Sequence, residues 1–110
     1  MSIYRVKTKV EGVFTSMDYF LEGKRILLSY DGDKTYSSTD LLDLDKTLKL
    51  QWIAVGLSFQ EWTITLLIAQ KKPDGTFDTE KKWTTSGEIP TTGGSQLYKE
   101  IDLSKLDANK

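Results

Sequence analysis

The chain has 110 residues, a length that suits one domain with a real hydrophobic core but not two domains. Hydrophobic residues make up 38% of the chain and charged residues 28%, so the composition predicts a folded domain rather than a disordered segment. The formal charge of -1 provides no overall field that would attract nucleic acid or an anionic membrane. We therefore expect a single domain over residues 1–110, with neither nucleic acid nor a membrane as its partner.

Cysteine and histidine are both absent from the sequence. Their absence excludes disulfides, thiolate zinc sites, cysteine nucleophiles and every mechanism that uses histidine as its base. The N-terminus lacks the apolar segment of a signal peptide, and no apolar run is long enough to span a bilayer. We expect a cytoplasmic protein that is not an enzyme and uses no cofactor.

The first predicted strand covers residues 4–10, where the even positions are apolar or threonine and the odd positions are basic. Residues 11–23 are apolar without a clear period, so a short strand and a helical turn both remain open. The apolar run 25–30 ends in Asp31-Gly32-Asp33, which predicts a strand entering a turn. Residues 36–45 combine hydroxyl and acidic side chains with leucines, a pattern of a capped helical turn or a loop, and we interpret them as a loop.

The second half of the chain is richer in strand signals. Residues 48–59 begin with alternation and become apolar on both faces, which predicts a central strand that is either buried on both sides or bulged near Gly56. Residues 62–69 alternate cleanly and predict the clearest strand of the chain. A hairpin turn at Pro73-Asp74-Gly75 leads into a strand over 77–83. A loop over 87–95 then precedes a last strand that contains Leu97, Ile101 and Leu103.

Several short strands separated by turns, without a long amphipathic helix, predict an all-β fold. We expect an antiparallel β-sandwich or a jelly roll, formed by a single compact domain with a polar C-terminal tail from about residue 104.

Two signals disagree about which strand residues pair across the hairpin. The turn residues favour a three-residue loop that pairs Lys72 with Thr76 and turns Trp83 outward. The hydrophobic pattern favours a register shifted by one residue, with Trp83 opposite Ile64 or Leu66 and facing the core. Because burial of charged side chains is costly, we favour the second register.

The 3 tryptophans and 5 tyrosines are the residues that most suggest a ligand surface, since flat aromatic rings stack on sugars and anchor protein partners. We assign Trp52 and Trp62 to the core. Trp83, Phe77 and Tyr98 are the candidate ligand-binding residues. The function that we expect is a non-catalytic binding module for carbohydrate or another protein, and the alternative is a structural subunit that self-associates into a homo-oligomer.

Other chemistries are less well supported. A two-carboxylate hydrolase is the remaining enzyme class, but no pair stands out among the candidates Glu11, Glu22, Glu61, Glu80 and Asp40. Calcium ligands could come from Asp31, Asp33, Asp40, Asp43 and Asp45, yet their spacing is not that of an EF-hand, and we assign no metal site. Lysines at 71, 72, 81 and 82 share the hairpin with acidic residues, which favours protected strand edges over nucleic-acid binding.

Overall fold

The computed structural model describes residues 2–108, which fold into two packed antiparallel sheets with no α-helix in that range. The strands are β1 (Ser2–Glu11), β2 (Ser16–Leu21), β3 (Lys24–Ile26), β4 (Ser29–Gly32), β5 (Thr35–Leu44), β6 (Thr47–Val55), β7 (Glu61–Gln70), β8 (Lys81–Glu88), β9 (Gly94–Asp102) and β10 (Asp107–Ala108), with a 3-10 turn, η1, over Leu103–Lys105. The predicted all-β sandwich is confirmed. Over these residues, no helix is long and apolar enough to cross a lipid bilayer.

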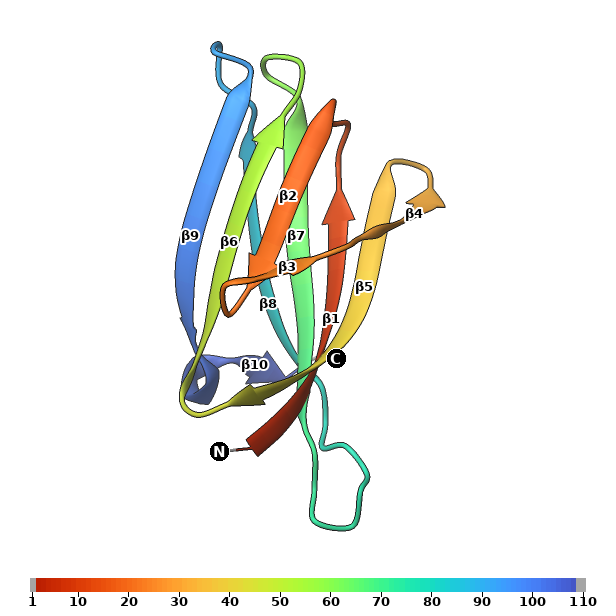
Figure 1. The fold of residues 1–110 in the computed structure, drawn as a ribbon, viewed down its shortest axis with the longest axis vertical. Helices are drawn as coiled ribbons and strands as arrows, with labels where there is room; N and C mark the ends of the chain where they lie inside the picture. The colour runs from red at the N-terminus through yellow and green to blue at the C-terminus, as the bar shows by residue number, and fades with distance from the viewer. Residues whose placement is uncertain (1, 109–110) are drawn as a thin grey trace.

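The larger sheet has six strands in the order β10-β8-β7-β1-β5-β4, and the smaller sheet has four in the order β3-β2-β6-β9 (Figure 1). Strand β1 lies in the middle of the larger sheet, where it pairs with β5 on one side and β7 on the other. Strand β6 has the same central role in the smaller sheet, between β2 and β9. Most pairings therefore join segments that are far apart in the sequence.

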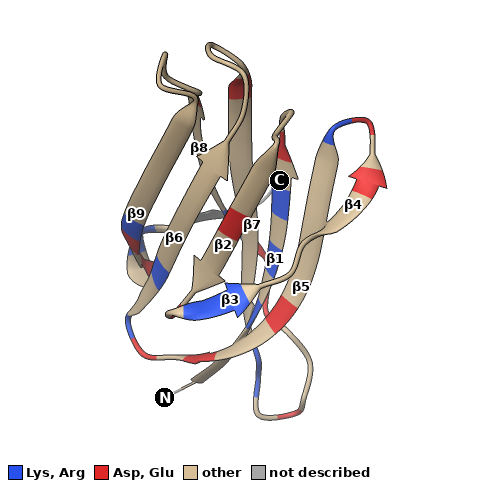
Figure 2. Cartoon of the chain, turned by 45° about the horizontal axis from the view of Figure 1, so that its top comes forward, with Lys and Arg blue, Asp and Glu red and all other residues tan. Residues whose placement is uncertain are grey.

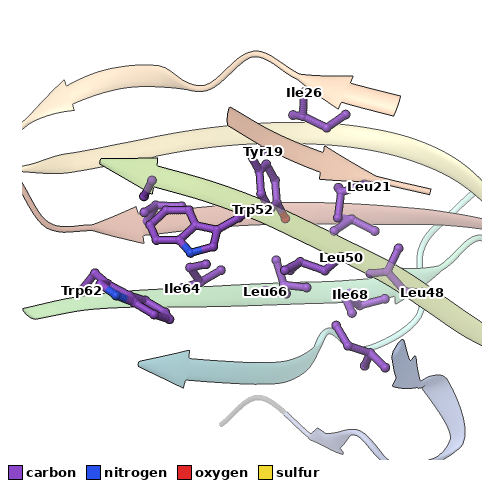
Figure 3. Close-up of a cluster of buried hydrophobic side chains, with 14 of the residues drawn as sticks. Tyr19, Leu21, Ile26, Leu48, Leu50, Trp52, Trp62, Ile64, Leu66 and Ile68 are labelled. Carbon is purple, nitrogen blue, oxygen red and sulfur yellow. The ribbon is translucent and has the colours of Figure 1, made fainter. Parts of the chain in front are cut away.

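Alternating side chains of strands β6 and β7, one from each sheet, form the middle of the core. Every second residue of β6, from Leu48 to Ala54, is fully buried, and the even positions of β7 face them from the other sheet (Figure 3). The rings of Trp52 and Trp62 lie 5.0 Å apart between the sheets, so their predicted place in the core is confirmed. Burial of one large apolar side chain stabilises the fold by about 1.5–3 kcal/mol, so this alternation accounts for the packing of the two sheets.

One polar pair lies within the core. The Thr8 hydroxyl on β1 and the Tyr19 hydroxyl on β2 are hydrogen bonded at 2.9 Å, and both side chains are buried. Burial raises the pKa of Tyr19 well above its ordinary value of 10.0, because the phenolate would lose its hydration. The bond joins the two sheets and satisfies two groups that would otherwise be costly to bury.

The prediction of a loop over residues 36–45 is wrong. This segment is β5, a strand of 10 residues that pairs with β1 along its whole length. Because the larger sheet is wider than the smaller one, the inner face of β5 is only partly covered, and polar Ser38 and Asp40 face inward with a hydrogen bond of 3.0 Å between them. The strand therefore lacks the apolar alternation of a fully covered strand.

The single strand predicted over residues 25–30 is also wrong. The chain forms β3 at the edge of the smaller sheet and then crosses to β4 at the edge of the larger one. Leu27 lies in this crossing and is 79% exposed, so the apolar run does not mark one buried strand. In the ambiguous segment 11–23, the short strand is the alternative that forms, as β2.

The hairpin contains both of the registers that the sequence suggested. At its tip, the Lys72 N–H donates to the Thr76 carbonyl at 2.7 Å, and the Gly75 N–H donates to the Lys72 carbonyl at 3.0 Å. These bonds define the three-residue loop that the turn residues favoured. Further along, however, Leu66 pairs with Trp83, the register that the hydrophobic pattern favoured.

A β-bulge reconciles the two registers. Lys71 is bridged to Phe77, and the next regular pair is Ile68 with Lys81. On β7 these pairs are three positions apart, from Ile68 to Lys71, but on the returning strand they are four positions apart, from Phe77 to Lys81. One extra residue therefore lies within 78–80. The bulge shifts every later side chain of β8 to the opposite face and delays the strand, which was predicted over 77–83 but begins at Lys81.

The loop between β8 and β9 is shorter than the predicted 87–95, because both strands extend into that range. After β9, the Asp102 carboxylate accepts a hydrogen bond from the Ser104 N–H at 2.9 Å and begins η1. Leu106 packs against the core, and β10 pairs with the start of β8. Part of the segment predicted as a polar tail is thus joined to the sandwich.

Candidate functional site

The three aromatic residues predicted to bind a ligand lie in three different places. Trp83 faces inward from β8 and packs, half-buried, against the core. Phe77 lies directly after the hairpin loop, where the Arg5 guanidinium covers its ring at 4.5 Å. Tyr98 points outward from β9 on the smaller sheet and is 56% exposed. The structure does not bring these residues into one site, and of the three only Tyr98 presents a mostly exposed ring.

Tyr98 borders a shallow depression on the outer face of the smaller sheet. Gln51 pairs with Tyr98 across β6 and β9, and Gln96 is the next outward residue on β9. The depression between them has a volume of about 280 Å³. The Tyr98 hydroxyl donates to the Glu100 carboxylate at 3.0 Å, and this bond raises the pKa of the phenol. An aromatic ring beside two amide side chains is suited to a sugar, but the depression is small.

A larger cleft opens at the end of the sandwich near the start of the hairpin. Its volume is about 640 Å³, within the range of pockets that hold small ligands. Apolar side chains of the larger sheet and of the chain after β9 line it: Tyr4, Ile68, Leu103 and Leu106. Polar side chains lie around these: Asp45, Lys46, Thr47, Gln70, Asp78, Thr79, Lys81, Asp102 and Ser104. We call this feature the end cleft.

Three irregular segments supply most of the polar groups of the end cleft. The bulge carries Asp78 and Thr79, and the Asp78 N–H donates to the Gln70 carbonyl at 2.8 Å. The turn between β5 and β6 carries Asp45, and the start of η1 carries Asp102. β-Bulges often lie beside binding sites, where they redirect a side chain out of the regular pattern. Here the segment that holds the extra residue contributes a carboxylate and a hydroxyl to the cleft.

The end cleft carries charges of both signs. Aspartates at 45, 78 and 102 accompany lysines at 46 and 81, so their charges nearly cancel. Hydrogen bonds from the Ser104 hydroxyl at 2.7 Å and the Ser104 N–H hold the pKa of Asp102 below its ordinary value, so this carboxylate stays ionised at neutral pH. A site with this balance has hydrogen-bonding groups of both kinds but no strong preference for an anion or a cation.

Charged residues elsewhere on the molecule are spread over several surfaces (Figure 2). The five aspartates considered as calcium ligands extend from β4 to the turn after β5, and among residues 2–108 no group of three or more acidic side chains could hold a metal ion. Lys81 faces the end cleft, whereas Lys82 faces the opposite side of the larger sheet. Because these two lysines face opposite sides, the hairpin lysines do not form one continuous basic patch. Glu80, which precedes them, is paired with Arg5 at 3.2 Å and Lys7 at 3.3 Å.

Sequence patterns did not identify the end cleft. Its residues come from five separate parts of the chain, and none of them forms a local motif. The one usable signal was the conflict between turn and strand registers, because both can hold only if an extra residue lies between them. Comparison with known proteins finds no matching family model, no matching curated protein and no matching solved structure.

Proposed function

We propose that this chain is a non-catalytic carbohydrate-binding domain that holds a neutral glycan in the end cleft. The observation that carries the proposal is the combination of an aromatic and aliphatic lining with many short polar side chains in one cleft of about 640 Å³. A sugar ring has an apolar face that packs on such a lining and hydroxyls that bond to carboxylates and amides.

The charge balance of the end cleft supports a neutral ligand. Acidic sugars and phosphorylated ligands need a surplus of lysine or arginine, and here the two lysines are outnumbered by three aspartates. Neutral sugars need no surplus charge. Exposed Gln70 and Thr79 add neutral donors and acceptors that suit hydroxyl groups.

The exposure of the end-cleft aspartates and the lowered pKa of Asp102 support binding rather than hydrolysis. A glycosidase needs one carboxyl group whose pKa is raised so that it can donate a proton. Asp45, Asp78 and Asp102 are all exposed, whereas such a proton donor is usually held in an apolar, buried setting. The pKa of Asp102 is shifted downward. A carboxylate hydrolase is therefore the weaker alternative.

The test is a screen of neutral oligosaccharides by glycan array, followed by titration calorimetry with the best binder. The variants Gln70→Ala and Asp45→Ala remove exposed side chains of the end cleft and should each weaken binding by about tenfold, the cost of one or two hydrogen bonds. Matched controls are Gln51→Ala and Asp43→Ala, which remove the same groups from outer sheet faces.

Two results would count against the proposal. If no neutral glycan binds at millimolar concentration, the domain is not a carbohydrate-binding module of this kind. If a glycan binds equally well to both end-cleft variants but not to Tyr98→Ala, the site is the depression on the smaller sheet instead.

A further inference from the structure

The four sheet edges differ in how they are protected from pairing with another strand. Natural proteins shorten edge strands, bulge them or point charges inward from them. Strand β3 has only 3 residues, and β4 has 4 residues with an irregular register. Strand β9 is long, but Lys99 points inward from its middle, opposite buried Leu50. Each of these three edges carries a recognised protective feature.

Strand β8 is the exception. Strand β10 covers it only at Lys81 and Lys82, near its lower end (Figure 1). Over the described residues, Trp83–Glu88 has no strand on its outer side. This stretch contains no proline, no register shift and no inward-facing charge. Six residues of open edge are longer than a typical protected edge and suit a further strand.

The pattern of hydrogen bonds within the sheet shows which groups are free on this edge. The Ile89 N–H donates to the Gln60 carbonyl at 2.9 Å, in the same register as the pairs between β7 and β8. Hydrogen-bonded pairs alternate along an antiparallel ladder, so residues 83, 85 and 87 direct their backbone groups toward β7. Thr84, Ser86 and Glu88 therefore direct their N–H and carbonyl groups outward.

We infer that two copies of this chain pair through these open edges, with the two β8 strands antiparallel and Ser86 opposite Ser86 at the twofold axis. In that register, Thr84 of each copy lies opposite Glu88 of the other. The three hydrogen-bonded pairs supply about six backbone hydrogen bonds between the copies. The three hydrogen-bonded pairs lie within Thr84–Glu88, whereas β10 pairs only with Lys81 and Lys82, so the two contacts use different residues of β8.

The side chains of β8 are complementary to themselves in this register. On the outer face, Glu88 of one copy lies diagonal to Lys82 of the other, within reach of a long side chain, and this pair occurs twice. On the inner face, Thr85 lies opposite Gly87. No like charges lie directly opposite each other. Within the monomer, by contrast, Glu88 pairs with Glu61, so the second copy supplies a cation that its own neighbouring strand lacks.

The test is analytical ultracentrifugation of the full chain over a wide concentration range. We expect the wild-type protein to shift reversibly from the 12.5 kDa monomer to twice that mass. Ser86→Pro removes an outward N–H without breaking a bond to β7, so it should raise the dimer dissociation constant by about tenfold or more while the monomer keeps its fold. Ser86→Ala keeps the backbone donor and should dimerise like the wild type.

A charge reversal tests the register. Glu88→Lys should weaken the dimer, and the double variant Lys82→Glu with Glu88→Lys should restore it. A wild-type protein that remains monomeric at hundreds of micromolar overturns the inference, as does a Ser86→Pro variant that is folded by circular dichroism and dimerises unchanged. Neutral glycans should bind equally well to the Ser86→Pro monomer, because the end cleft lies outside this edge. The dimer proposal and the glycan proposal can therefore fail independently of each other.

Discussion

At the scale of single residues, the Thr8 and Tyr19 pair shows how the core accommodates polar groups. Neither side chain is exposed, and each hydroxyl is the other's partner at 2.9 Å. The sequence placed Thr8 correctly on the inner face of the first strand, by alternation alone. It gave no sign that Tyr19 was its partner, because residues 11–23 have no period from which a face could be read.

The raised pKa of Tyr19 predicts a stability that depends on alkaline pH. Below the ordinary tyrosine pKa of 10.0, the phenol is protonated in both folded and unfolded chains, and its stabilising contribution is fully present. Above that pH only the unfolded chain ionises readily, so the free energy of unfolding should fall by about 1.4 kcal/mol for each pH unit from this group. Urea denaturation between pH 8 and 11 measures the fall.

Two phenylalanine variants separate this group from the other tyrosines. Tyr19→Phe lowers stability at neutral pH, because Thr8 loses its partner, but it should flatten the alkaline dependence. Tyr98→Phe changes a tyrosine on the outer sheet face and should leave most of the dependence in place. An equally steep fall in Tyr19→Phe would contradict the assignment to Tyr19.

At the scale of elements, alternation predicted strands correctly wherever both faces had a clear environment. Strands β1, β6 and β7 lie at the centre of their sheets, and their buried positions were apparent from the sequence. The prediction failed for β5 because the smaller sheet covers its inner face only partly, so Asp40 can face inward without being fully buried. The width of the opposing sheet decides that pattern, and it is not encoded within the strand.

The hairpin illustrates a different limit. Its two local signals were both right, and a single extra residue in 78–80 allows them to coexist. A bulge of this kind has no sequence signature of its own. The end cleft was equally hidden, since the segment with the extra residue contributes Asp78 and Thr79 to a lining that is assembled from separate parts of the chain.

Removal of the extra residue should leave the facing of β8 unchanged. Deletion of Thr79 takes out the bulge, so the register of the hairpin tip runs directly into the pair of Leu66 with Trp83, and Trp83 stays on the inner face. We expect the tryptophan emission of the wild type and a change of less than about 1 kcal/mol in unfolding free energy. Urea titration followed by fluorescence measures both quantities.

The matched control for the deletion is Thr79→Ala, which keeps the number of residues and should change stability by less than about 0.5 kcal/mol, since Thr79 is exposed. A deletion variant with red-shifted emission would mean that Trp83 has turned outward and that the strand does not pair through Leu66 and Trp83 as expected.

At the scale of the whole molecule, the sandwich is built from pairings between distant segments. Strand β1 is joined to β5 and β7, and the last long strand, β9, completes the smaller sheet beside β6. The chain must lose the entropy of closing long loops before these contacts stabilise it, so all-β folds of this kind form in about milliseconds to seconds. The composition predicted a single folded domain, but the strand order could not be read from any local pattern.

The position of β1 predicts which contacts control the folding rate. Val6 lies in the middle of the larger sheet, with a strand on each side, whereas Ile101 lies on edge strand β9. Val6→Ala should slow folding, and Ile101→Ala should mainly speed unfolding, because the edge forms after the centre. Stopped-flow tryptophan fluorescence gives both rates. The reverse assignment of the two effects would show that the smaller sheet forms first.

The bulge after the hairpin also separates two tasks that usually share the same residues. The loop over Lys72–Thr76 closes with its own hydrogen bonds, while the facing of β8 is set afterwards, between residues 78 and 80. Changes in the composition of the loop therefore do not propagate into the orientation of Trp83. The hairpin tip is structurally independent of the core. A foreign recognition loop can therefore be displayed there, at the end of the sandwich, without redesign of the core.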